Sequence, residues 1–417
     1  MNKIKADGKV YVTLLILLIG ICAFTMRKQE GLVSFCFHAT FIVLFIGLMA
    51  QMMKMPRIGD LHIWAIITIA LSFFCVIINE NIWQIEYYNK LIIFWCSILI
   101  IPFVATMEVD KALVNKVLRL NLIIAATYPI KYFLSADAGY YLVGYIEKEA
   151  VLSFNFSNPN LAGMFLMHSI LYCFIAMYYF KKRRTRGVIV LLTIILFYFC
   201  YLTQARSTII SMMFFGGLTI LSVFMKKNVR FSPKFSLLII LSPLIISYIY
   251  LIVVDTGMLE KVFGFFVSGQ GKTLTSRVKV WKIATNGIKG NLLTGDYYGI
   301  YIGRYIYEML HNTHLDMLLS YGIFPFVGFV MLVFKCTKKV IPLATTDFSR
   351  MALFAFFAVI LQGSFEAALV SGGLGLYIMS FGFLILAKYN EEDRKEYETK
   401  NGYVHVCNPR GRAVIRK

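Results

Sequence analysis

The sequence predicts an all-α polytopic membrane protein with about twelve transmembrane helices and one large extracytoplasmic loop between helices nine and ten. Composition is the first reason: 59% of the 417 residues are hydrophobic, 15% are charged, and the mean hydropathy is +0.71. Soluble domains do not have this composition. The second reason is that apolar stretches of about 20 residues, long enough to cross a bilayer, follow one another along nearly the whole chain. A β-barrel would instead show short alternating strands.

The first apolar stretch, Val10–Met26, is predicted to be a retained span and not a signal peptide, because Arg27 and Lys28 follow it without a cleavage site. The spans divide the chain into helices one to nine (1–254), the large loop (255–311), helices ten to twelve (312–387) and a tail (388–417). The predicted spans are Val10–Met26, Leu32–Met53, Leu61–Asn79, Leu91–Thr106, Val117–Ser135, Pro159–Phe180, Gly187–Thr203, Ser207–Met225, Phe235–Val254, Asn312–Lys335, Met351–Glu366 and Gly373–Ala387.

The net charge of +20 is concentrated at the ends of the spans. Most lysines and arginines fall on one side when the loops are assigned alternately, including the run that begins at Lys181 and the tail. The positive-inside rule makes this side cytoplasmic and predicts that both termini lie there. The charge is therefore typical of a membrane protein among anionic lipids, and we expect no nucleic-acid partner.

The large loop is more basic than the orientation rule predicts for an outer segment, so we expect an anionic partner on that face. Thr275 or Ser276 begins a predicted helix that ends at Gly287. Within it Arg277 and Trp281 are four residues apart, on one face, which suits a phosphate or a sugar ring. The alternative is a tryptophan anchor beside a snorkelling arginine. The basic residues of the loop are Lys261, Lys272, Arg277, Lys279, Lys282, Lys289 and Arg304.

Two shorter outer segments carry further polar groups. Arg206 lies in a very short turn between spans seven and eight, at membrane level, where an arginine is costly unless it is paired or functional. Span six begins with Asn158 as a cap and Pro159 at the first helical position, so Asn160 is an additional polar group at the outer surface. Glu366, near the outer end of span eleven, either faces a water-filled cavity or snorkels.

The start of span ten, "LHNTHLDMLL" from Leu310, combines histidines with an acid at the mouth of an apolar helix. Asn312 or Thr313 can cap this helix, and Asp316 complements its dipole. His311 is the stronger functional candidate because imidazole titrates near neutrality and lies at the end of the basic loop. A metal site of His311, His314 and Asp316 is disfavoured, because their spacing does not converge on one helical face. We therefore expect neither a metal nor a cofactor.

Together these residues resemble the bacterial O-antigen polymerase and O-antigen ligase superfamily. The resemblance covers about residues 158–326 and consists of "NPNLAG" at the start of span six, Arg206, "SRVKVW" in the loop and "HN…L…L…YGIFP" from His311. It implies an enzyme on the outer face of the bacterial cytoplasmic membrane that transfers glycans from undecaprenyl pyrophosphate. It also implies that Arg206 and Arg277 hold the pyrophosphate and that His311 contacts or activates the acceptor hydroxyl.

The expected function is therefore a Wzy-type polysaccharide polymerase, metal-independent and inverting, that joins lipid-linked repeat units into capsule, exopolysaccharide or O-antigen. A ligase that moves the glycan to lipid A core or another acceptor is the alternative, and a multi-span transporter, disfavoured by the absence of matching halves, is the second. Expected partners are the lipid-linked oligosaccharide, membrane lipid, and flippase and chain-length regulator proteins. Expected substrate contacts come from Trp281, Asn312, Asn160, His314, Lys279 and Arg304.

Overall fold

The structure is a computed structural model, and it is an all-α, multi-pass membrane protein in its described parts. It describes residues 5–55, 58–79, 85–135, 139–143, 149–156, 158–224, 231–255, 271–296, 300–302, 305–307, 310–366, 375–389, 404–407 and 413–416. Its helices are α1 (Ala6–Met26), α2 (Glu30–Lys54), α3 (Asp60–Ile78), α4 (Ile85–Thr106), α5 (Lys111–Leu134), α6 (Pro159–Tyr179), α7 (Arg183–Leu202), α8 (Arg206–Phe224), α9 (Pro233–Asp255), α11 (Gly271–Gly290), α12 (Thr313–Tyr321), α13 (Ile323–Val340), α14 (Asp347–Gln362) and α15 (Leu376–Ala387).

Eight of the described helices, α1 to α3 and α5 to α9, are long and apolar enough to cross a membrane. Each coincides with a predicted span. The remaining predicted spans fall on α4, whose described apolar stretch is shorter, on the α12–α13 pair, on α14 and on α15. The multi-pass architecture is therefore confirmed, and the count of twelve spans stays a prediction.

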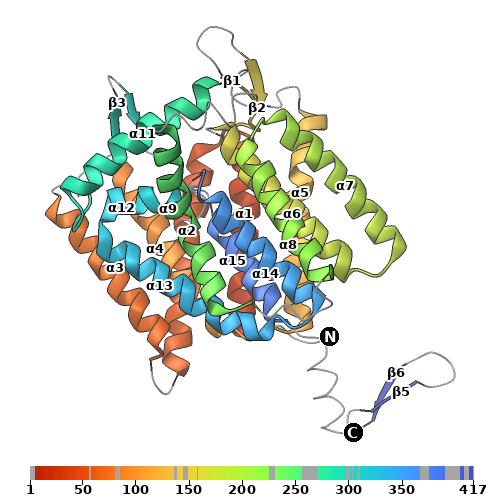
Figure 1. Ribbon diagram of the computed structural model, residues 1–417. Coiled ribbons are helices and arrows are strands. Elements are labelled where there is room, and N and C mark those ends of the chain that lie inside the picture. The colour runs from red at the N-terminus through yellow and green to blue at the C-terminus, as the bar shows by residue number, and fades with distance from the viewer. Residues whose placement is uncertain are drawn as a thin grey trace.

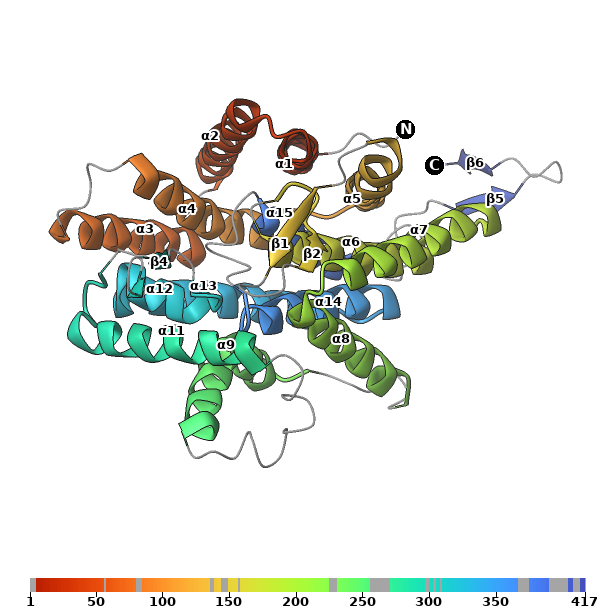
Figure 2. The same ribbon diagram turned by 90° about the horizontal axis from the view of Figure 1, so that it is seen from above.

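The helices form a buried centre and a lipid-facing periphery. Helices α6, α14 and α15 lie near the centre of the bundle, with α2, α3, α7, α8 and α9 around it (Figure 2). In α6 the apolar window is 83% buried, whereas in α7 it is 28% buried. The exposed residues Val188, Leu191 and Ile194 of α7 recur every three positions and so share one face. That apolar face suits lipid contact.

Helix α15 is fixed in the centre by buried hydroxyl groups. The hydroxyl of Tyr11 donates to the carbonyl of Ile378 at 2.5 Å, and that of Tyr172 donates to the carbonyl of Met379 at 2.7 Å. Both hydroxyl oxygens would lie 2.3 Å from a Cβ atom at Gly382. Only glycine therefore permits this approach, and in a water-free interior the hydroxyls need these partners.

The described start of the chain and the end of α15 lie at the same end of the bundle. Lys5 forms an ion pair with Glu108, just after α4. Lys388, just after α15, donates from its ammonium group to the carbonyls of Val104 and Ala105 at 2.9 and 3.2 Å. A lysine placed on the last carbonyls of a helix satisfies acceptors that the helix leaves open.

The opposite end of the bundle, at the top of Figure 1, carries α11 and two hairpins. Between α5 and α6, β1 (Tyr140–Val143) pairs antiparallel with β2 (Glu149–Leu152), and after α11, β3 (Ile300–Ile302) pairs with β4 (Tyr305–Tyr307). A third hairpin in the tail pairs β5 (Val404–Cys407) with β6 (Ala413–Arg416). Helix α11 matches the helix predicted between Thr275 or Ser276 and Gly287, although it begins earlier, at Gly271. The large extracytoplasmic loop itself stays a prediction.

The prediction of one continuous span over Asn312–Lys335 was wrong. The chain breaks at Gly322, whose φ of 76° lies in the left-handed region, and continues as α13. The segment after α11 packs into this break: the Ile323 amide donates to the carbonyl of Leu292 at 2.8 Å. A Cβ atom at Gly322 would lie 2.3 Å from the carbonyl oxygen of Leu293. Glycine is therefore required both for the backbone conformation and for the close approach.

Candidate functional site

The centre of the candidate site is a carboxylate–imidazole pair between His311 and Glu366. Nδ1 of His311 lies 2.8 Å from Oε2 of Glu366, where α12 is about to begin and α14 has just ended. The Glu366 side chain is 4% exposed and that of His311 is 25% exposed. A neutral imidazole that donates from Nδ1 to this carboxylate leaves Nε2 as a proton acceptor on a partly exposed ring.

The backbone at His311 is held in an uncommon conformation. Its φ of 51° lies in the left-handed region, which few residues other than glycine adopt, although asparagine, aspartate and histidine do so more often than the rest. Such a conformation persists only where the surroundings fix it, and it is frequent at functional sites. Here the fixing contacts are made by the two neighbouring residues, Leu310 and Asn312.

Trp281 of α11 fixes the residue before His311. Its indole Nε1 donates to the carbonyl of Leu310 at 2.7 Å, and its ring meets that of Tyr250 of α9 edge-on at 5.5 Å. The Trp281 side chain is fully buried. In this structure the residue therefore positions His311 from the loop helix, and the substrate contact expected of it stays a prediction.

Asn312 fixes the residue after His311. Its Oδ1 accepts from the amides of His314 and Leu315, both at 3.0 Å, and so caps α12 as predicted. Its Nδ2 donates to the carbonyls of Pro243 of α9 and Ser364 at 2.8 and 3.0 Å. Both donors of this buried amide are therefore used within the protein, and its expected substrate contact also stays a prediction.

The segment Gln362–Glu366, at the end of α14, makes hydrogen bonds to the start of α12 and to the start of α8. The Thr313 amide donates to the carbonyl of Gly363 at 2.8 Å. Nε2 of Gln362 donates to Oγ1 of Thr208 at 3.3 Å. Because Glu366 pairs with His311, one short segment contacts both helices and places them at the same end of the bundle.

Arg206 lies at this end of the bundle, as the first residue of α8 and two residues before Thr208. It is exposed. The turn before it packs tightly on α6: a Cβ atom at Gly163 would lie 2.3 Å from Cβ of Ala205. Asn160, in the first turn of α6, is three residues before Gly163 and is half-buried. The structure thus brings the starts of α6, α8 and α12 to one end.

The basic residues of the loop are described only in part. Arg277 and Lys279 lie in α11, and Arg277 is one helical turn before Trp281, but both side chains lie outside the described part of the structure. Arg304 lies outside the described residues altogether. The helix that carries Arg277 is nevertheless tied to the residue before His311 through the Trp281 indole.

His314 and Asp316 face different neighbours, and neither joins His311. The ring of His314 is buried and meets Phe326 edge-on at 5.2 Å. It makes no well-formed hydrogen bond to a described residue, although the Ile240 carbonyl lies near it. Oδ1 of Asp316 lies 3.6 Å from Nζ of Lys90. Within the described residues no group of three or more histidine, cysteine or acidic side chains is placed to hold a metal.

The sequence reasoning missed the partner of His311. The sequence predicts that Glu366, near the outer end of a span, faces a cavity or snorkels, and it does not predict a contact with imidazole. The signal that could have identified this pair is the high free-energy cost of an unpaired carboxylate inside an apolar stretch. Such a carboxylate needs a partner, which tends to be a cationic or hydrogen-bonding group at the same depth. No local pattern in the sequence predicts the contact between Gln362 and Thr208.

Comparisons of the chain with protein-family models, with curated proteins and with solved structures found no match.

Proposed function

We propose that this protein is a polysaccharide polymerase at the outer face of a bacterial cytoplasmic membrane. It transfers a glycan from undecaprenyl pyrophosphate to a sugar hydroxyl of another lipid-linked repeat unit. The observation that carries the proposal is the His311–Glu366 pair. It lies at the end of the bundle where Arg206 begins α8 and where the basic helix α11 contacts the segment before α12.

In the proposed reaction His311 is the general base. The acceptor hydroxyl attacks the anomeric carbon of the donor, its proton passes to Nε2 of His311, and the bond from that carbon to the pyrophosphate oxygen breaks. Glu366 holds the ring through Nδ1 and stabilises the imidazolium that forms, as a buried carboxylate does beside other catalytic histidines. Attack from the face opposite the leaving group inverts the anomeric configuration.

Arginines neutralise the leaving pyrophosphate in the proposed reaction. Negative charge grows on the pyrophosphate as the glycosidic bond breaks, and fixed guanidinium groups stabilise such charge without reorganisation. Arg206 is exposed at the same end of the bundle as His311, and Arg277 is one turn from Trp281 on α11. We assign both to the pyrophosphate. In the proposed transfer, the two arginines neutralise the leaving pyrophosphate and His311 accepts the proton of the acceptor hydroxyl.

A ligase is the alternative within the same chemistry. It would take the same donor and use the same base, but its acceptor would be lipid A core or another molecule. No described residue distinguishes the two acceptors, so a polymerase and a ligase must be told apart by their reaction products. A polymerase yields a ladder of chains that remain on lipid pyrophosphate, whereas a ligase yields one transfer to a different acceptor.

The test is transfer by the purified full-length protein in lipid vesicles supplied with an undecaprenyl-pyrophosphate-linked oligosaccharide. The proposal expects a ladder of longer lipid-linked glycans with wild-type protein and none with His311→Ala. Transfer of the whole glycan to added lipid A core, without a ladder, would identify a ligase. Wild-type protein that inserts and folds but transfers glycan to neither acceptor would overturn the proposal.

A further inference from the structure

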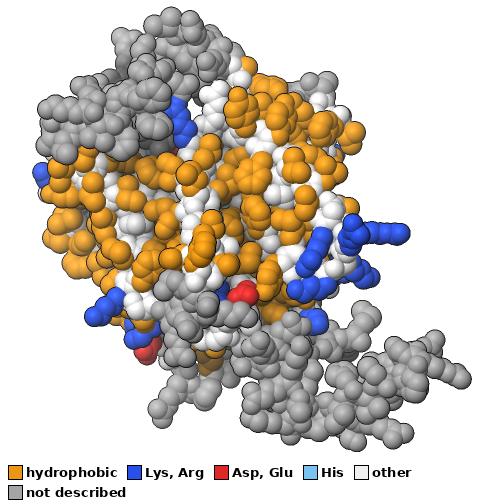
Figure 3. Space-filling view, turned by 45° about the vertical axis from the view of Figure 1, so that its right-hand side comes forward, with side chains coloured by type: hydrophobic (Ala, Val, Ile, Leu, Met, Phe, Trp, Pro, Cys, Tyr) orange, Lys and Arg blue, Asp and Glu red, His pale blue; other side chains and the backbone are white. Residues whose placement is uncertain are grey.

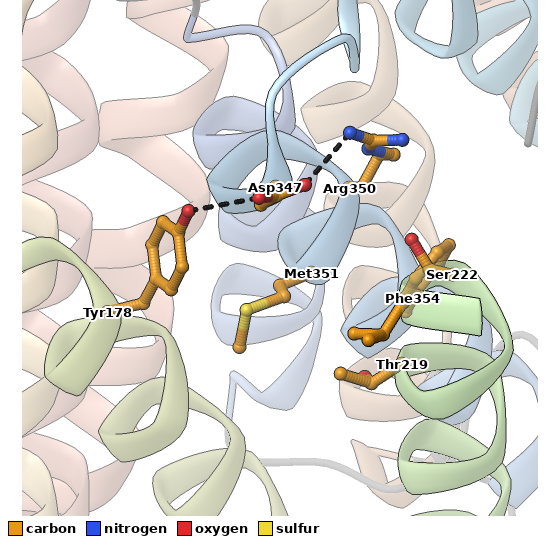
Figure 4. A pocket seen from close by; sticks show the side chains of 8 residues that line it. Tyr178, Thr219, Ser222, Asp347, Arg350, Met351 and Phe354 are labelled. Atoms are coloured by element: carbon orange, nitrogen blue, oxygen red, sulfur yellow. Dashed lines mark hydrogen bonds and ion pairs between the residues drawn. The ribbon is translucent and has the colours of Figure 1, made fainter. Parts of the chain in front are cut away.

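A second candidate site lies at the end of the bundle opposite His311. A hollow of about 560 Å³ is present among α6, α8 and α14 (Figure 4). It is lined near the end of α6 by Tyr178 and near the start of α14 by Asp347 and Arg350. His311 and Glu366, by contrast, lie near the other end of α14. This volume is in the range, roughly 300–1000 Å³, that sites for small molecules occupy.

One wall of the hollow is mainly apolar. Met351 and Phe354 of α14 and Val223 of α8 supply this wall, with Thr219 and Ser222 between them. Val223 is 74% exposed, on a helix whose outer face is apolar. The hollow is therefore open toward the lipid-facing side of the bundle, where an acyl chain can enter it sideways.

The mouth of the hollow is polar, and its carboxylate is paired with a guanidinium group. The Asp347 carboxylate accepts a hydrogen bond from the Arg350 guanidinium at 2.9 Å and another from the hydroxyl of Tyr178 at 3.3 Å. The Arg350 side chain is 5% exposed. Because the carboxylate is paired with a buried cation, it does not present an uncompensated negative charge to a ligand at the mouth.

A lysine lies at this mouth, and further basic residues follow it in the sequence. Nζ of Lys181 lies 4.9 Å from the centre of the Tyr178 ring and donates to the Tyr178 carbonyl at 3.1 Å. Further exposed cations follow at once, and Figure 3 shows lysine and arginine side chains gathered at the lower right of a face that is otherwise largely hydrophobic. These cations are Lys182, Arg183, Arg184 and Arg186.

We propose that this hollow is a binding site for an anionic glycerophospholipid. One acyl chain lies against Val223, Met351 and Phe354, and the phosphate of the headgroup lies beside Lys181 and Arg183. Basic residues next to an apolar wall select anionic over zwitterionic lipid, because each lysine or arginine attracts a phosphate-bearing headgroup of net negative charge. The site is separate from the proposed glycan-transfer site and does not depend on its function.

The test is native mass spectrometry of the full-length protein in mild detergent, titrated with phosphatidylglycerol or with phosphatidylcholine. Saturable binding of phosphatidylglycerol at one site is expected, with clearly weaker binding of phosphatidylcholine. Thr219→Trp fills the hollow and should remove the saturable component. Lys181→Gln should weaken phosphatidylglycerol binding roughly fivefold, the effect of one basic residue near a headgroup. Ser222→Phe fills the hollow from a neighbouring position in case Thr219→Trp does not fold.

Two matched variants control for general effects of these changes. Ile220→Trp adds the same ring to α8 at an exposed position outside the hollow, and Lys54→Gln removes an exposed lysine at the end of α2. Both should bind phosphatidylglycerol as wild type does. Equal binding of the two lipids, or equal loss in Thr219→Trp and Ile220→Trp, would overturn the proposal. So would unchanged binding in folded Thr219→Trp and Ser222→Phe.

Discussion

The indole of Trp281 donates its hydrogen bond to the carbonyl of Leu310, the residue directly before His311. Trp281 and Leu310 are 29 positions apart in the sequence. The contact ties helix α11, which carries Arg277, to the start of α12, and Tyr250 packs against the same indole from α9. A substitution at Trp281 should therefore affect the geometry of the candidate site without removing any of its charged groups.

The first prediction concerns Trp281→Phe. The phenyl ring retains most of the packing but leaves the buried carbonyl of Leu310 without its donor, which costs about 1–3 kcal/mol. Glycan transfer should fall, and the thermal midpoint of the purified protein should decrease. Trp95→Phe is the matched control, because the Trp95 indole donates to Oγ of Ser72 in another part of the bundle. It should lower stability without a comparable loss of transfer.

The second prediction separates the two members of the carboxylate–imidazole pair. His311→Ala removes the proposed base and should lower the rate of glycan transfer roughly 10²- to 10⁴-fold. Glu366→Gln keeps a hydrogen-bonding group near Nδ1 but removes the charge that stabilises imidazolium, so the rate should fall by a smaller factor. Rates are measured on vesicle-embedded protein at matched amounts.

Glu30→Gln serves as the control for the loss of a carboxylate. Glu30 is exposed at the start of α2 and forms no part of the candidate site. Its variant should transfer glycan at the wild-type rate. Wild-type rates in folded Glu366→Gln would instead limit Glu366 to a structural contact.

The third prediction concerns the two arginines assigned to pyrophosphate. Arg206→Ala and Arg277→Ala should each abolish long glycan chains while membrane insertion and protein amount stay unchanged. Arg206→Lys should restore only part of the activity, because an ammonium group cannot bind two phosphate oxygens as a guanidinium does. Electrophoretic ladders of surface polysaccharide from cells that express each variant provide the measurement.

Arg119→Ala is the control for the loss of an exposed arginine. Arg119 lies in α5, outside both proposed sites, and its variant should give full-length chains. Full-length chains from Arg277→Ala would exclude this residue from the proposed site, even if the other substitutions behaved as expected.

Much of the helical architecture could be predicted because a bilayer imposes it. A spanning segment must satisfy its backbone groups internally and be long enough to cross, so long apolar stretches such as Val10–Met26 are readable directly from the sequence. His311 was a candidate because an imidazole at the mouth of an apolar helix is conspicuous. Its partner was not identified, because Glu366 is 55 residues away and no local pattern links the two.

The break at Gly322 could not be predicted for a related reason. Glycine is frequent in transmembrane helices, and most such glycines do not interrupt them. The helix breaks at Gly322 because the carbonyl of Leu293 occupies the space where a side chain would lie. That contact joins two segments far apart in the sequence, and only the folded arrangement reveals it.

The last prediction follows from this break. Gly322→Ala forces a Cβ atom to within 2.3 Å of the Leu293 carbonyl oxygen, at a φ of 76°. The strain of the left-handed backbone alone costs about 1–3 kcal/mol, and the clash adds to it. Thermal unfolding of the detergent-purified variant should therefore begin at a clearly lower temperature than that of wild type.

Gly216→Ala is the matched control, because a Cβ atom at Gly216 in α8 meets nothing within 4 Å. Alanine is the better helix former by about 1 kcal/mol, so this variant should be neutral or slightly stabilised. If Gly322→Ala and Gly216→Ala unfolded at the same temperature as wild type, the chain could not be broken at Gly322 as described. A continuous helix would then join α12 to α13, and the hydrogen bond from the Ile323 amide to the Leu292 carbonyl would be lost.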